Sequence, residues 1–371
     1  MLLGEGLRMF KRRLRINSNN KKFLHRYSGN HLEICSKIIG DCWNSTDNFF
    51  MTSAGHFCEF WVRDFAFNIK SLIALGYEEK CEETLQYALS HFINQGHITT
   101  TINPQGKPFN FPNYTPESLA LILYSLDCLK SKNLLKKYMS FLESEAEYVF
   151  NRSIDKKTGL ITKKEIYYSC RDHIKRYSSC YDNTMMGLLS RLLTKNKIEN
   201  PFSEFDYEHI LIDNFWKKNH FIDDLSGSND ITGDANSIPY VFLLDKPKFN
   251  IMLKKSIEKI QELKLDIPLV IKYSSKKESK ANIADIFAKD YESDSCWPHV
   301  GYNYISAVMR VNKKLALKYL NAYKEKIEEH HTFPEVYFYD GTIFKSPFYY
   351  CDEAMLWSAN HLAYYQELKV D

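Results

Sequence analysis

The sequence predicts an all-α protein, and three observations carry this prediction. Hydrophobic residues recur at helical spacing along most of the 371 residues, which is the primary signal of amphipathic helices. Glycine and proline are scarce, with 14 and 11 residues, and this deficit argues against a fold of many short strands joined by turns. Aromatic side chains make up 15% of the chain, a surplus that suits either broad helix–helix contacts or the lining of a ligand site.

The chain is long enough for one large domain or for two ordinary ones, since a domain averages about 150 residues. Apolar residues make up 44% of it, which is enough to bury a sizeable core. No change in composition marks a domain boundary within the body of the chain. We therefore predict a basic N-terminal leader at residues 1–26 and a single domain at residues 27–371.

Helical periodicity divides the chain into about a dozen segments. Gly96 ends the third segment, because glycine readily adopts the left-handed conformation found after a helix, and Pro116-Glu117 is a start signal for the fourth. The predicted helices lie near 32–43, 64–75, 81–93, 117–129, 135–150, 185–192, 205–217, 234–244, 250–263, 302–309, 316–327 and 353–366.

Strand-like runs are short and lie between the helices. The run 99–102 leads into the turn 103–106, and the run 336–339 leads into Asp340-Gly341. Both turn sequences favour a β-hairpin. We therefore expect a helical scaffold whose long interhelical loops carry short hairpins.

Positive charge is concentrated in the leader. The whole chain carries a formal net charge of +3, yet residues 1–26 contain a cluster of Arg and Lys against the single acid Glu5. The remainder is therefore slightly acidic, unlike a nucleic-acid-binding protein, which spreads positive charge over its body. We expect a solvated leader, with an organelle-targeting signal or an arm touching an anionic partner as alternatives.

The compartment and the cofactor class are predicted from membrane-span and secretion signals and from the cysteine pattern. It has no apolar stretch of the length needed to span a membrane, and no secretion signal. Its nine cysteines are scattered and include no C-x-x-C pair, which is typical of reduced, buried thiols rather than of a zinc site. We predict a cytoplasmic protein with no bound metal and with neither nucleic acid nor membrane as a partner.

Four loops combine aromatic residues with acids, and catalytic residues concentrate in loops on a rigid scaffold. The first, 56–65, contains Trp61, Arg63 and Asp64. It fits a buried ion pair at a helix N-terminus, with Asp64 in the first turn. It also fits a clamp for a polyhydroxyl ligand, because a sugar hydroxyl needs a donor and an acceptor together while the sugar ring stacks on an indole.

The second loop, 177–184, contains Tyr181, Asp182 and Asn183. Ser178 or Asp182 can cap the following helix. A cap does not account for the whole polar set beside a cysteine and two methionines, where a carboxyl would be partly desolvated and its pKa raised. A raised carboxyl pKa suits a general acid at neutral pH. The polar run 171–173 just upstream reads either as a solvated loop or as additional site residues.

The third and fourth loops lie toward the C-terminus. Loop 294–303 holds Trp297 and His299 around a proline, which fits a helix start as well as a stacking wall. Loop 331–337 holds Glu335 and Tyr337, with Glu353 further on. Glu335 lies in an apolar, aromatic run, so it is either a structural carboxylate bonded to the backbone or an arginine, or a catalytic acid or base.

Asp182 and Glu335 form a candidate acid and base pair. Inverting glycosidases hold two such carboxyls ~6.5–9.5 Å apart across the sugar, which leaves room for a water molecule. The separation of the two residues along the chain does not give their separation in space.

At these four loops the sequence resembles the inverting (α/α)6-barrel glycosidases, namely glycoside hydrolase families 15, 37 and 63 and the debranching-type glucosidases. Residues 61–64 look like their W-x-R-D segment and 297–299 are similar to the G-P-x-W-P loop, both of which line the sugar site. Residues 179–183 look like the E-S-G-x-D-N segment, whose aspartate is the general acid. Residues 333–337 are similar to the F-x-E-x-Y segment, which carries the general base.

The resemblance implies an (α/α)6 toroid that hydrolyses an α-linked glucoside or short oligosaccharide with inversion and without a cofactor. Asp182 would be the general acid and Glu335 the general base. The sugar would be held by the other residues that match or flank the motifs, namely Trp61, Arg63, Asp64, Tyr181, Asn183, Trp297, His299, Tyr337 and Glu353. Ser178 and Cys180 depart from the expected Glu and Gly, so this would be a divergent member.

Two other functions remain open on the same scaffold. A sugar epimerase or isomerase would depend on a histidine pair, for which His56, His173, His299 and His361 are candidates. A non-catalytic carbohydrate-binding protein would keep the barrel with a degenerate site, as the Ser178 and Cys180 departures suggest.

Overall fold

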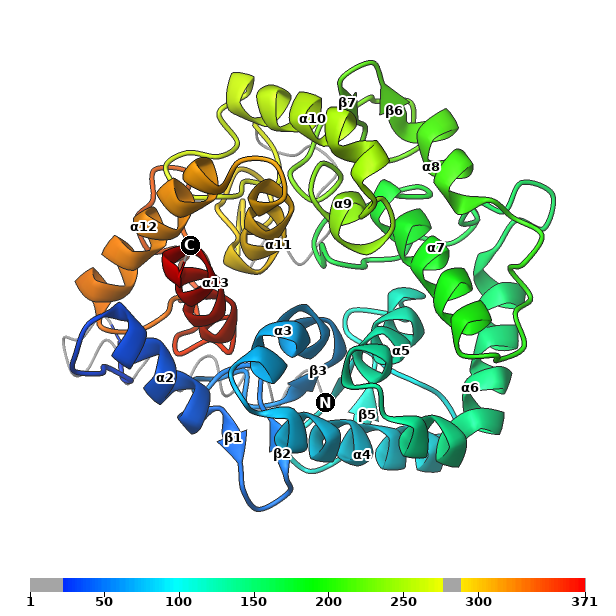
Figure 1. Cartoon of the computed structure of the whole chain (residues 1–371), viewed down its shortest axis with the longest axis horizontal. Helices are drawn as coiled ribbons and strands as arrows, with labels where there is room; N and C mark the ends of the chain where they lie inside the picture. The colour runs from blue at the N-terminus through cyan, green and yellow to red at the C-terminus, as the bar shows by residue number, and fades with distance from the viewer. Residues whose placement is uncertain (1–22, 276–287, 371) are drawn as a thin grey trace.

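The computed structural model describes residues 23–275 and 288–370. Within this part of the chain, helices arranged as two concentric rings form nearly the whole molecule (Figure 1). The inner ring consists of α3 (Val62–Ala74), α5 (Glu117–Leu129), α7 (Cys180–Lys195), α9 (Ile238–Phe242), α11 (Pro298–Met309) and α13 (Ser358–Val370). The outer ring consists of α2 (His31–Asp41), α4 (Glu78–Gln95), α6 (Lys132–Ser153), α8 (Tyr207–Phe215), α10 (Asn250–Glu262) and α12 (Lys313–His330).

The inner ring closes on itself. Each inner helix contacts the next one along the chain, and α13 contacts α3, so that the six form a continuous ring (Figure 1). Outer and inner helices alternate in the sequence, which makes the chain a series of six helical hairpins. This is the (α/α)6 toroid that the sequence predicts.

The position of each helix follows from the distribution of its apolar residues. Helix α5 is buried on all sides, including Leu119, Ile122 and Leu126, as expected of a helix that is apolar all round. Helix α4 buries a single stripe, including Leu85 and Phe92, and its other face is polar. These two helices therefore differ already in the sequence.

The predicted helix ends agree with the structure at three sites. Gly96 follows α4 with a φ of 89°, Pro116 precedes α5, and Pro298 is the first residue of α11. The cap of α7 differs from the prediction. Ser179, rather than Ser178 or Asp182, is its N-cap, and the Ser179 side chain accepts the backbone N–H of Asp182.

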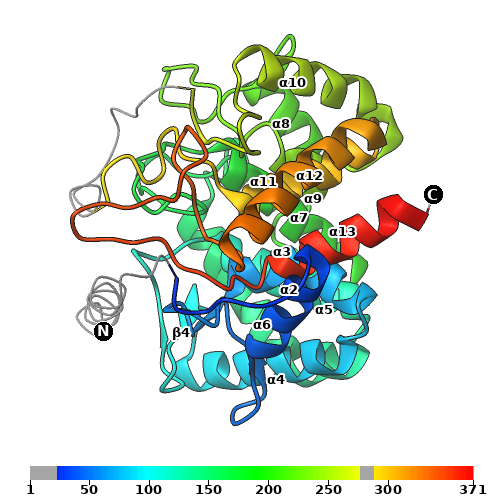
Figure 2. The same ribbon diagram turned by 90° about the vertical axis from the view of Figure 1, so that its left-hand side faces the viewer.

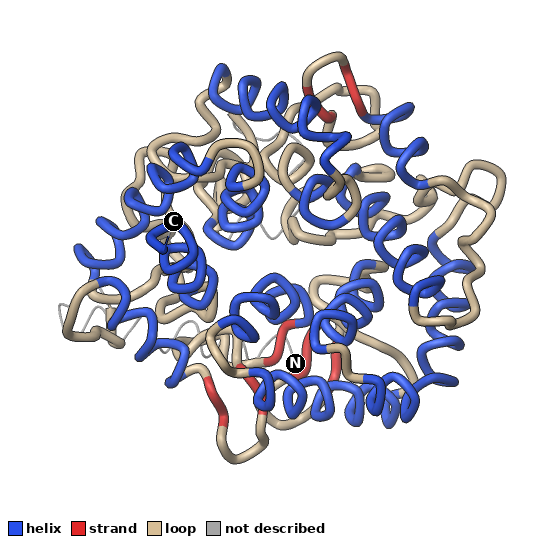
Figure 3. Tube along the Cα trace, in the orientation of Figure 1, coloured by secondary structure: helices blue, strands red, loops and turns tan. Residues whose placement is uncertain are grey.

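The strands pair within the loops (Figure 3). Strands β1 (Trp43–Asn44) and β2 (Phe49–Phe50) form one hairpin, and β6 (Trp216–Lys217) and β7 (His220–Phe221) form another. Between them in sequence, β3 (Phe60–Trp61), β4 (Thr101–Ile102) and β5 (Pro108–Phe109) form an antiparallel sheet in that order. The predicted hairpin after 99–102 is therefore confirmed as β4–β5.

No strand forms at 336–339, although the predicted turn at Asp340-Gly341 is present and brings Tyr337 opposite Ile343. Tyr337 makes only isolated bridges within the described residues, to Cys296 and to Ile343. The predicted last helix also starts late, at Ser358 rather than near 353. Backbone bonds such as that from Met355 to Phe333 hold residues 331–357 as an irregular loop that folds back on itself.

The connections between helices differ in length at the two ends of the toroid. Those from an outer to the next inner helix are long and span 42–61, 96–116, 154–179, 216–237, 263–297 and 331–357. The connections back to the outer ring include the short 75–77, 130–131 and 310–312. The long connections all meet the N-terminal ends of the inner helices, and most of them gather on the left in Figure 2.

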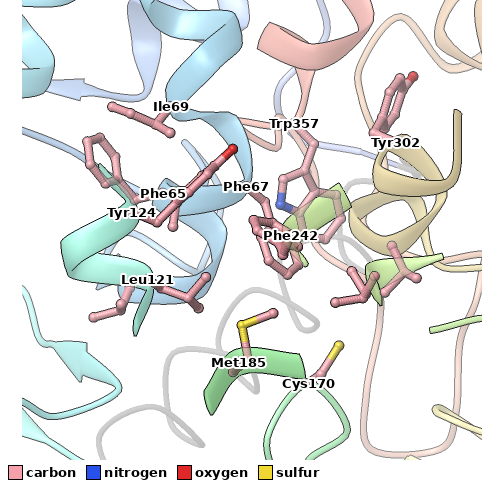
Figure 4. Close-up of a cluster of buried hydrophobic side chains, with 14 of the residues drawn as sticks. Phe65, Phe67, Ile69, Leu121, Tyr124, Cys170, Met185, Phe242, Tyr302 and Trp357 are labelled. Carbon is pink, nitrogen blue, oxygen red and sulfur yellow. The ribbon is translucent and has the colours of Figure 1, made fainter. Parts of the chain in front are cut away.

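The hydrophobic core fills the centre of the inner ring. The Phe242 ring lies 5.5 Å from the Phe67 ring and 5.1 Å from the Tyr124 ring. Met185 and Trp357 belong to the same buried cluster (Figure 4). None of the nine cysteines, all of which lie in the described part of the chain, forms a disulfide, and seven of them are buried, in agreement with the predicted reduced thiols.

The body begins earlier than the predicted boundary at residue 26. Phe23 is buried and packs against His330 and Tyr350 at ring distances of 5.6 and 6.0 Å. The basic residues that precede it lie outside the described residues, as do residues 276–280 of the polar loop that begins at Ser274. None of the helices in the described ranges is long and apolar enough to cross a membrane.

Candidate active site

Glu335 lies at the end of the toroid where the long connections meet, held by three hydrogen bonds. The hydroxyls of Tyr291 and Tyr349 donate to its two carboxylate oxygens, and the backbone N–H of Asp352 donates to Oε2 at 2.7 Å. Burial raises the pKa of the Glu335 carboxyl, and Asp352 raises it further, against the effect of His56 and the two tyrosines. Glu335 is therefore a desolvated carboxyl in a fixed orientation.

His56 and Asp352 lie directly behind this carboxyl. The His56 Nε2 atom is 3.4 Å from the Tyr349 hydroxyl, and His56 Nδ1 is 3.0 Å from Asp352 Oδ1. Asp352 also accepts the backbone N–H groups of His56 and Phe57, each at 2.9 Å. The Asp352 carboxylate occupies the space that a side chain at position 55 would need, which is why that position is glycine.

Tyr291 connects Glu335 to the third loop. Its ring lies 4.7 Å from the Trp297 ring, and the Trp297 indole N–H donates to the Tyr291 carbonyl at 2.8 Å. On the other side the Tyr291 ring lies 5.1 Å from the His173 ring. Tyr291 therefore contacts both the predicted wall residue Trp297 and the carboxyl of the predicted base, Glu335.

A second cluster surrounds Arg63. Its guanidinium lies 3.2 Å from Glu117 and 3.9 Å from Asp172, and the Tyr181 hydroxyl donates to the other oxygen of Glu117. Burial alone would lower the pKa of Arg63, but the charges of Glu117 and Asp172 outweigh it and raise that pKa. The ion pairs of Arg63 are therefore with these two acids, whereas the sequence suggests the neighbouring Asp64.

The two clusters meet at residues 172 and 173. His173 packs on Tyr291, which bonds Glu335, while Asp172 pairs with Arg63. All four loops predicted from the sequence thus contribute to one connected group of contacts.

Asp182 occupies the first turn of α7, next to Tyr181. Its Oδ2 atom accepts the Ser179 hydroxyl at 2.6 Å, and the Ser169 hydroxyl also interacts with the carboxyl. Burial raises the pKa of Asp182 to about 6, and the opposing effect of Arg176 limits the rise. The prediction that this carboxyl is desolvated, with a raised pKa, is therefore confirmed.

Arg176 belongs to a buried charge network below Asp182. It lies 2.8 Å from Asp234 and 3.4 Å from Asp223, and Arg171 lies 3.5 Å from Asp223. These side chains are almost completely buried. The network fixes Arg176 close enough to Asp182 for its charge to oppose the rise of the Asp182 pKa.

Three further predicted site residues lie along the inner edge of the site. Trp61 is buried near Phe57, and its indole N–H has no partner among the residues described. Asp64 accepts the Trp357 indole N–H at 3.0 Å. His299 is buried against the Trp297 and Trp357 rings, and burial holds its pKa well below the usual value.

The remaining predicted residues make structural contacts. The Asn183 side chain accepts the Ile161 N–H at 3.0 Å and so holds the loop before α7. Tyr337 links two loops through its backbone bonds with Cys296. Glu353 accepts the backbone N–H of Leu24 at 2.9 Å and lies 3.4 Å from His25, so it holds the N-terminal segment.

Sequence reasoning did not single out Glu117, Tyr291 or Tyr349 as site residues. Glu117 is an acid at the start of a helix that is otherwise almost wholly apolar, and that isolation was the available signal. The two tyrosines are indistinguishable in sequence from the many others in the chain.

The structure shows no cluster suited to a metal ion. Within residues 23–275 and 288–370, no group of three or more His, Cys, Asp or Glu side chains is arranged to hold one.

Neither a protein-family profile nor a curated protein matches the chain. Solved structures do match it. A rhamnosidase from Klebsiella oxytoca with rhamnose bound has a TM-score of 0.64 at 11% identity, and the match covers 93% of this chain and 66% of that one, just under two thirds. A GH63 mannosylglycerate hydrolase from Thermus thermophilus, in complex with Tris and D-glycerate, has a TM-score of 0.60 at 11% identity, over 91% and 100% of the two chains.

A glycosidase in complex with glucose is similar to the same extent. Its TM-score is 0.59 at 12% identity, over 92% of this chain and 97% of that one. Identities this low establish the architecture alone. The chain therefore has the (α/α)6 toroid fold of the six-hairpin glycosidases.

Proposed function

We propose that the protein is a glycoside hydrolase that cleaves an α-linked glucoside or short oligosaccharide with inversion. The observation that carries the proposal is the convergence of the four predicted loops at one end of a glycosidase-type toroid. The contacts run from Glu335 through Tyr291, His173, Asp172 and Arg63 to Glu117. They end at Tyr181, which bonds Glu117 and is the neighbour of Asp182.

Unsatisfied polar atoms support a ligand at this place. Trp61 Nε1 and Arg63 Nε are buried and make no hydrogen bond within the described residues. Buried polar groups in native proteins are nearly always paired. A polyhydroxyl ligand supplies the acceptors that these two N–H groups lack.

In the proposed mechanism Asp182 is the general acid. Its pKa of about 6 keeps a substantial fraction protonated in mildly acidic solution, and the proton passes to the leaving glycosidic oxygen. Glu335 is the general base and removes a proton from the attacking water. The hydroxyls of Tyr291 and Tyr349 orient the Glu335 carboxylate.

The glucoside specificity and the inversion come from the resemblance of the loop sequences to inverting glycosidases. The structural neighbours include proteins named for rhamnose and mannosylglycerate, and one that holds glucose. The substrate panel should therefore contain α-linked glucosides, mannosides and rhamnosides.

The test is hydrolysis of this panel, followed by NMR of the anomer that forms first. Inversion predicts release of the β-anomer from an α-glycoside. Release of the α-anomer would contradict the mechanism, and absence of hydrolysis on every member would contradict the function. Tight sugar binding without turnover would instead favour a carbohydrate-binding protein.

A sugar epimerase is the second candidate, because three of the four histidines considered for it, His56, His173 and His299, border the site. His56 is close to Tyr349, and His173 packs on Tyr291. If Asp182→Asn leaves turnover intact while a His56 or His173 substitution abolishes it, the epimerase function is correct.

A further inference from the structure

Asp172 and Arg63 are the members of the site that solvent reaches. Their side chains are 17% and 14% exposed, whereas the Glu117 side chain is 3% exposed. Asp182 and Glu335 are each 2% exposed. A ligand that enters from solvent therefore meets the Arg63–Asp172 pair before it meets the two proposed catalytic carboxyls.

The backbone around Asp172 is held firmly. The N–H groups of Asp172 and His173 donate to the two carboxylate oxygens of Glu292, each at 2.7 Å. The Arg171 side chain donates to the Glu292 carbonyl at 2.6 Å and lies over the Tyr273 ring at 4.8 Å. Because Asp172 is fixed from both sides, its carboxyl is presented in a defined position.

The spacing of the pair suits a bridging hydroxyl. Arg63 Nη2 and Asp172 Oδ1 are 3.9 Å apart, too far for a direct hydrogen bond. If an oxygen lies at normal hydrogen-bond distance from both atoms, the angle at that oxygen between Nη2 and Oδ1 is roughly a right angle. A sugar hydroxyl can then accept from the guanidinium and donate to the carboxyl at the same time.

We propose that Asp172 is a specificity-determining residue that binds one hydroxyl of the substrate sugar together with Arg63. The inference rests on the proposed function, in that the ligand is a sugar. It replaces the Arg63–Asp64 clamp suggested by the sequence, because Asp64 is bonded to Trp357 instead.

The protonation of Asp172 determines which variant preserves the contact. Burial raises the pKa of Asp172 to about 8; Arg63 opposes the rise, and Glu292 adds to it. The charged or titratable groups around it are Arg63 from α3, Glu117 from α5, and His173 and Glu292 from the loops. Asparagine keeps the shape of the aspartate side chain and an oxygen that can accept the bridged hydroxyl, so it is the variant that preserves the contact.

The test compares Asp172→Asn and Asp172→Ala with the wild-type protein on the best substrate of the panel and on its monodeoxy analogues. We expect Asp172→Asn to keep kcat/KM within about threefold at pH 6.5, and Asp172→Ala to lower it about 10- to 100-fold. For the deoxy analogue that lacks the bridged hydroxyl, Asp172→Ala should lower kcat/KM little relative to the wild-type protein, because the contact is already absent. The matched control is Asp213→Ala, an exposed aspartate on the outer helix α8, with unchanged kinetics.

Three results would overturn the inference. Asp172→Ala could keep wild-type kcat/KM, or it could weaken all deoxy analogues equally. Asp172→Asn could lose activity on the glycoside but keep it on the corresponding glycosyl fluoride, whose leaving group needs no proton, which would make Asp172 the proton donor instead. Melting temperatures of both variants establish that they are folded.

The proposed function can fail independently of this inference. If the wild-type protein binds but does not hydrolyse glucose-, mannose- or rhamnose-containing glycosides, calorimetry with the deoxy series replaces kinetics. Loss of selectivity for one hydroxyl in Asp172→Ala would support the clamp even without catalysis. If none of these sugars binds, the inference is wrong.

Discussion

Tyr349 donates its hydroxyl proton to Glu335 across 2.5 Å, while the same hydroxyl lies 3.4 Å from His56. Tyr349 thus links the carboxyl proposed as the general base to His56, and His56 in turn contacts Asp352. Tyr349 is in this sense a positioning residue for Glu335.

Replacing Tyr349 by Phe should shift the acidic limb of the pH profile. The hydroxyl stabilises the ionised form of Glu335, so its loss raises the Glu335 pKa and moves the acidic limb of kcat/KM to higher pH. We also expect kcat to fall by about tenfold. Tyr339→Phe is the control, since Tyr339 lies in the same loop but is 57% exposed. An unchanged acidic limb in Tyr349→Phe would exclude this role.

Asp182→Asn should abolish the hydrolysis of substrates that need a protonated leaving group. Loss of a general acid typically costs about 10²–10⁴-fold. Hydrolysis of a glycosyl fluoride should survive, and the alkaline limb near pH 6 in the wild-type profile should disappear. Equal losses on the glycoside and on the fluoride would argue against Asp182 as the acid.

The buried histidine pair should make stability depend on pH. His31 Nδ1 and His361 Nε2 are 2.8 Å apart, and Tyr302 bonds the other His361 nitrogen at 2.8 Å. Burial lowers the pKa of His361 to about 3 and also lowers that of His31. The unfolded chain therefore binds more protons than the folded one below pH 6.5, so stability falls as the pH drops below that value.

His361→Gln removes the larger of these two contributions. At pH 5 the wild-type protein should have lost about 2 kcal/mol of unfolding free energy through His361, relative to pH 7. The difference between wild type and variant, measured by urea unfolding, should therefore become smaller as the pH falls. A difference that is constant between pH 7 and 5 would show that His361 is not held neutral in the folded state.

Arg176→Met should destabilise the fold strongly. Its partners Asp223 and Asp234 are buried, and removing one member of a buried ion network leaves uncompensated charge at a cost of about 3–5 kcal/mol. Lys195→Met breaks the ion pair with Asp127, in which the lysine is 62% exposed, and should cost less than about 1 kcal/mol. The free energy of unfolding of both variants is measured in urea. Equal losses in the two variants would contradict the buried ion network.

The helical part of the fold was predictable because its signal is local. Helix α5, which is apolar all round, and helix α4, which is apolar on one stripe, already differ in the sequence. The loop 331–357 was harder, since the backbone bonds that keep it irregular link Glu335 to Asp352 and Met355 to Phe333. Such pairings leave no periodic trace in the sequence.

The site was predictable at the level of loops but not of partners. The pattern of aromatic residues and acids singled out the loops of Arg63 and Glu335, which the structure brings into one group of contacts. It could not show that Arg63 would pair with Glu117 and Asp172, because these acids reach it through the packing of α5 on α3 and through the loop before α7. Glu353 carries a catalytic residue type, yet it holds the N-terminal segment.

Because the connections differ in length, the two ends of the molecule differ in how far their loops can change. The short turns at 75–77, 130–131 and 310–312 leave little freedom to change without disturbing the helices they join. The long segments at the opposite end bond to one another around Glu335 and Asp172, so those that share these contacts would have to be exchanged together. A different substrate could thus be accommodated by grafting a set of contacting segments from another toroid, while the rings that set the stability stay as they are.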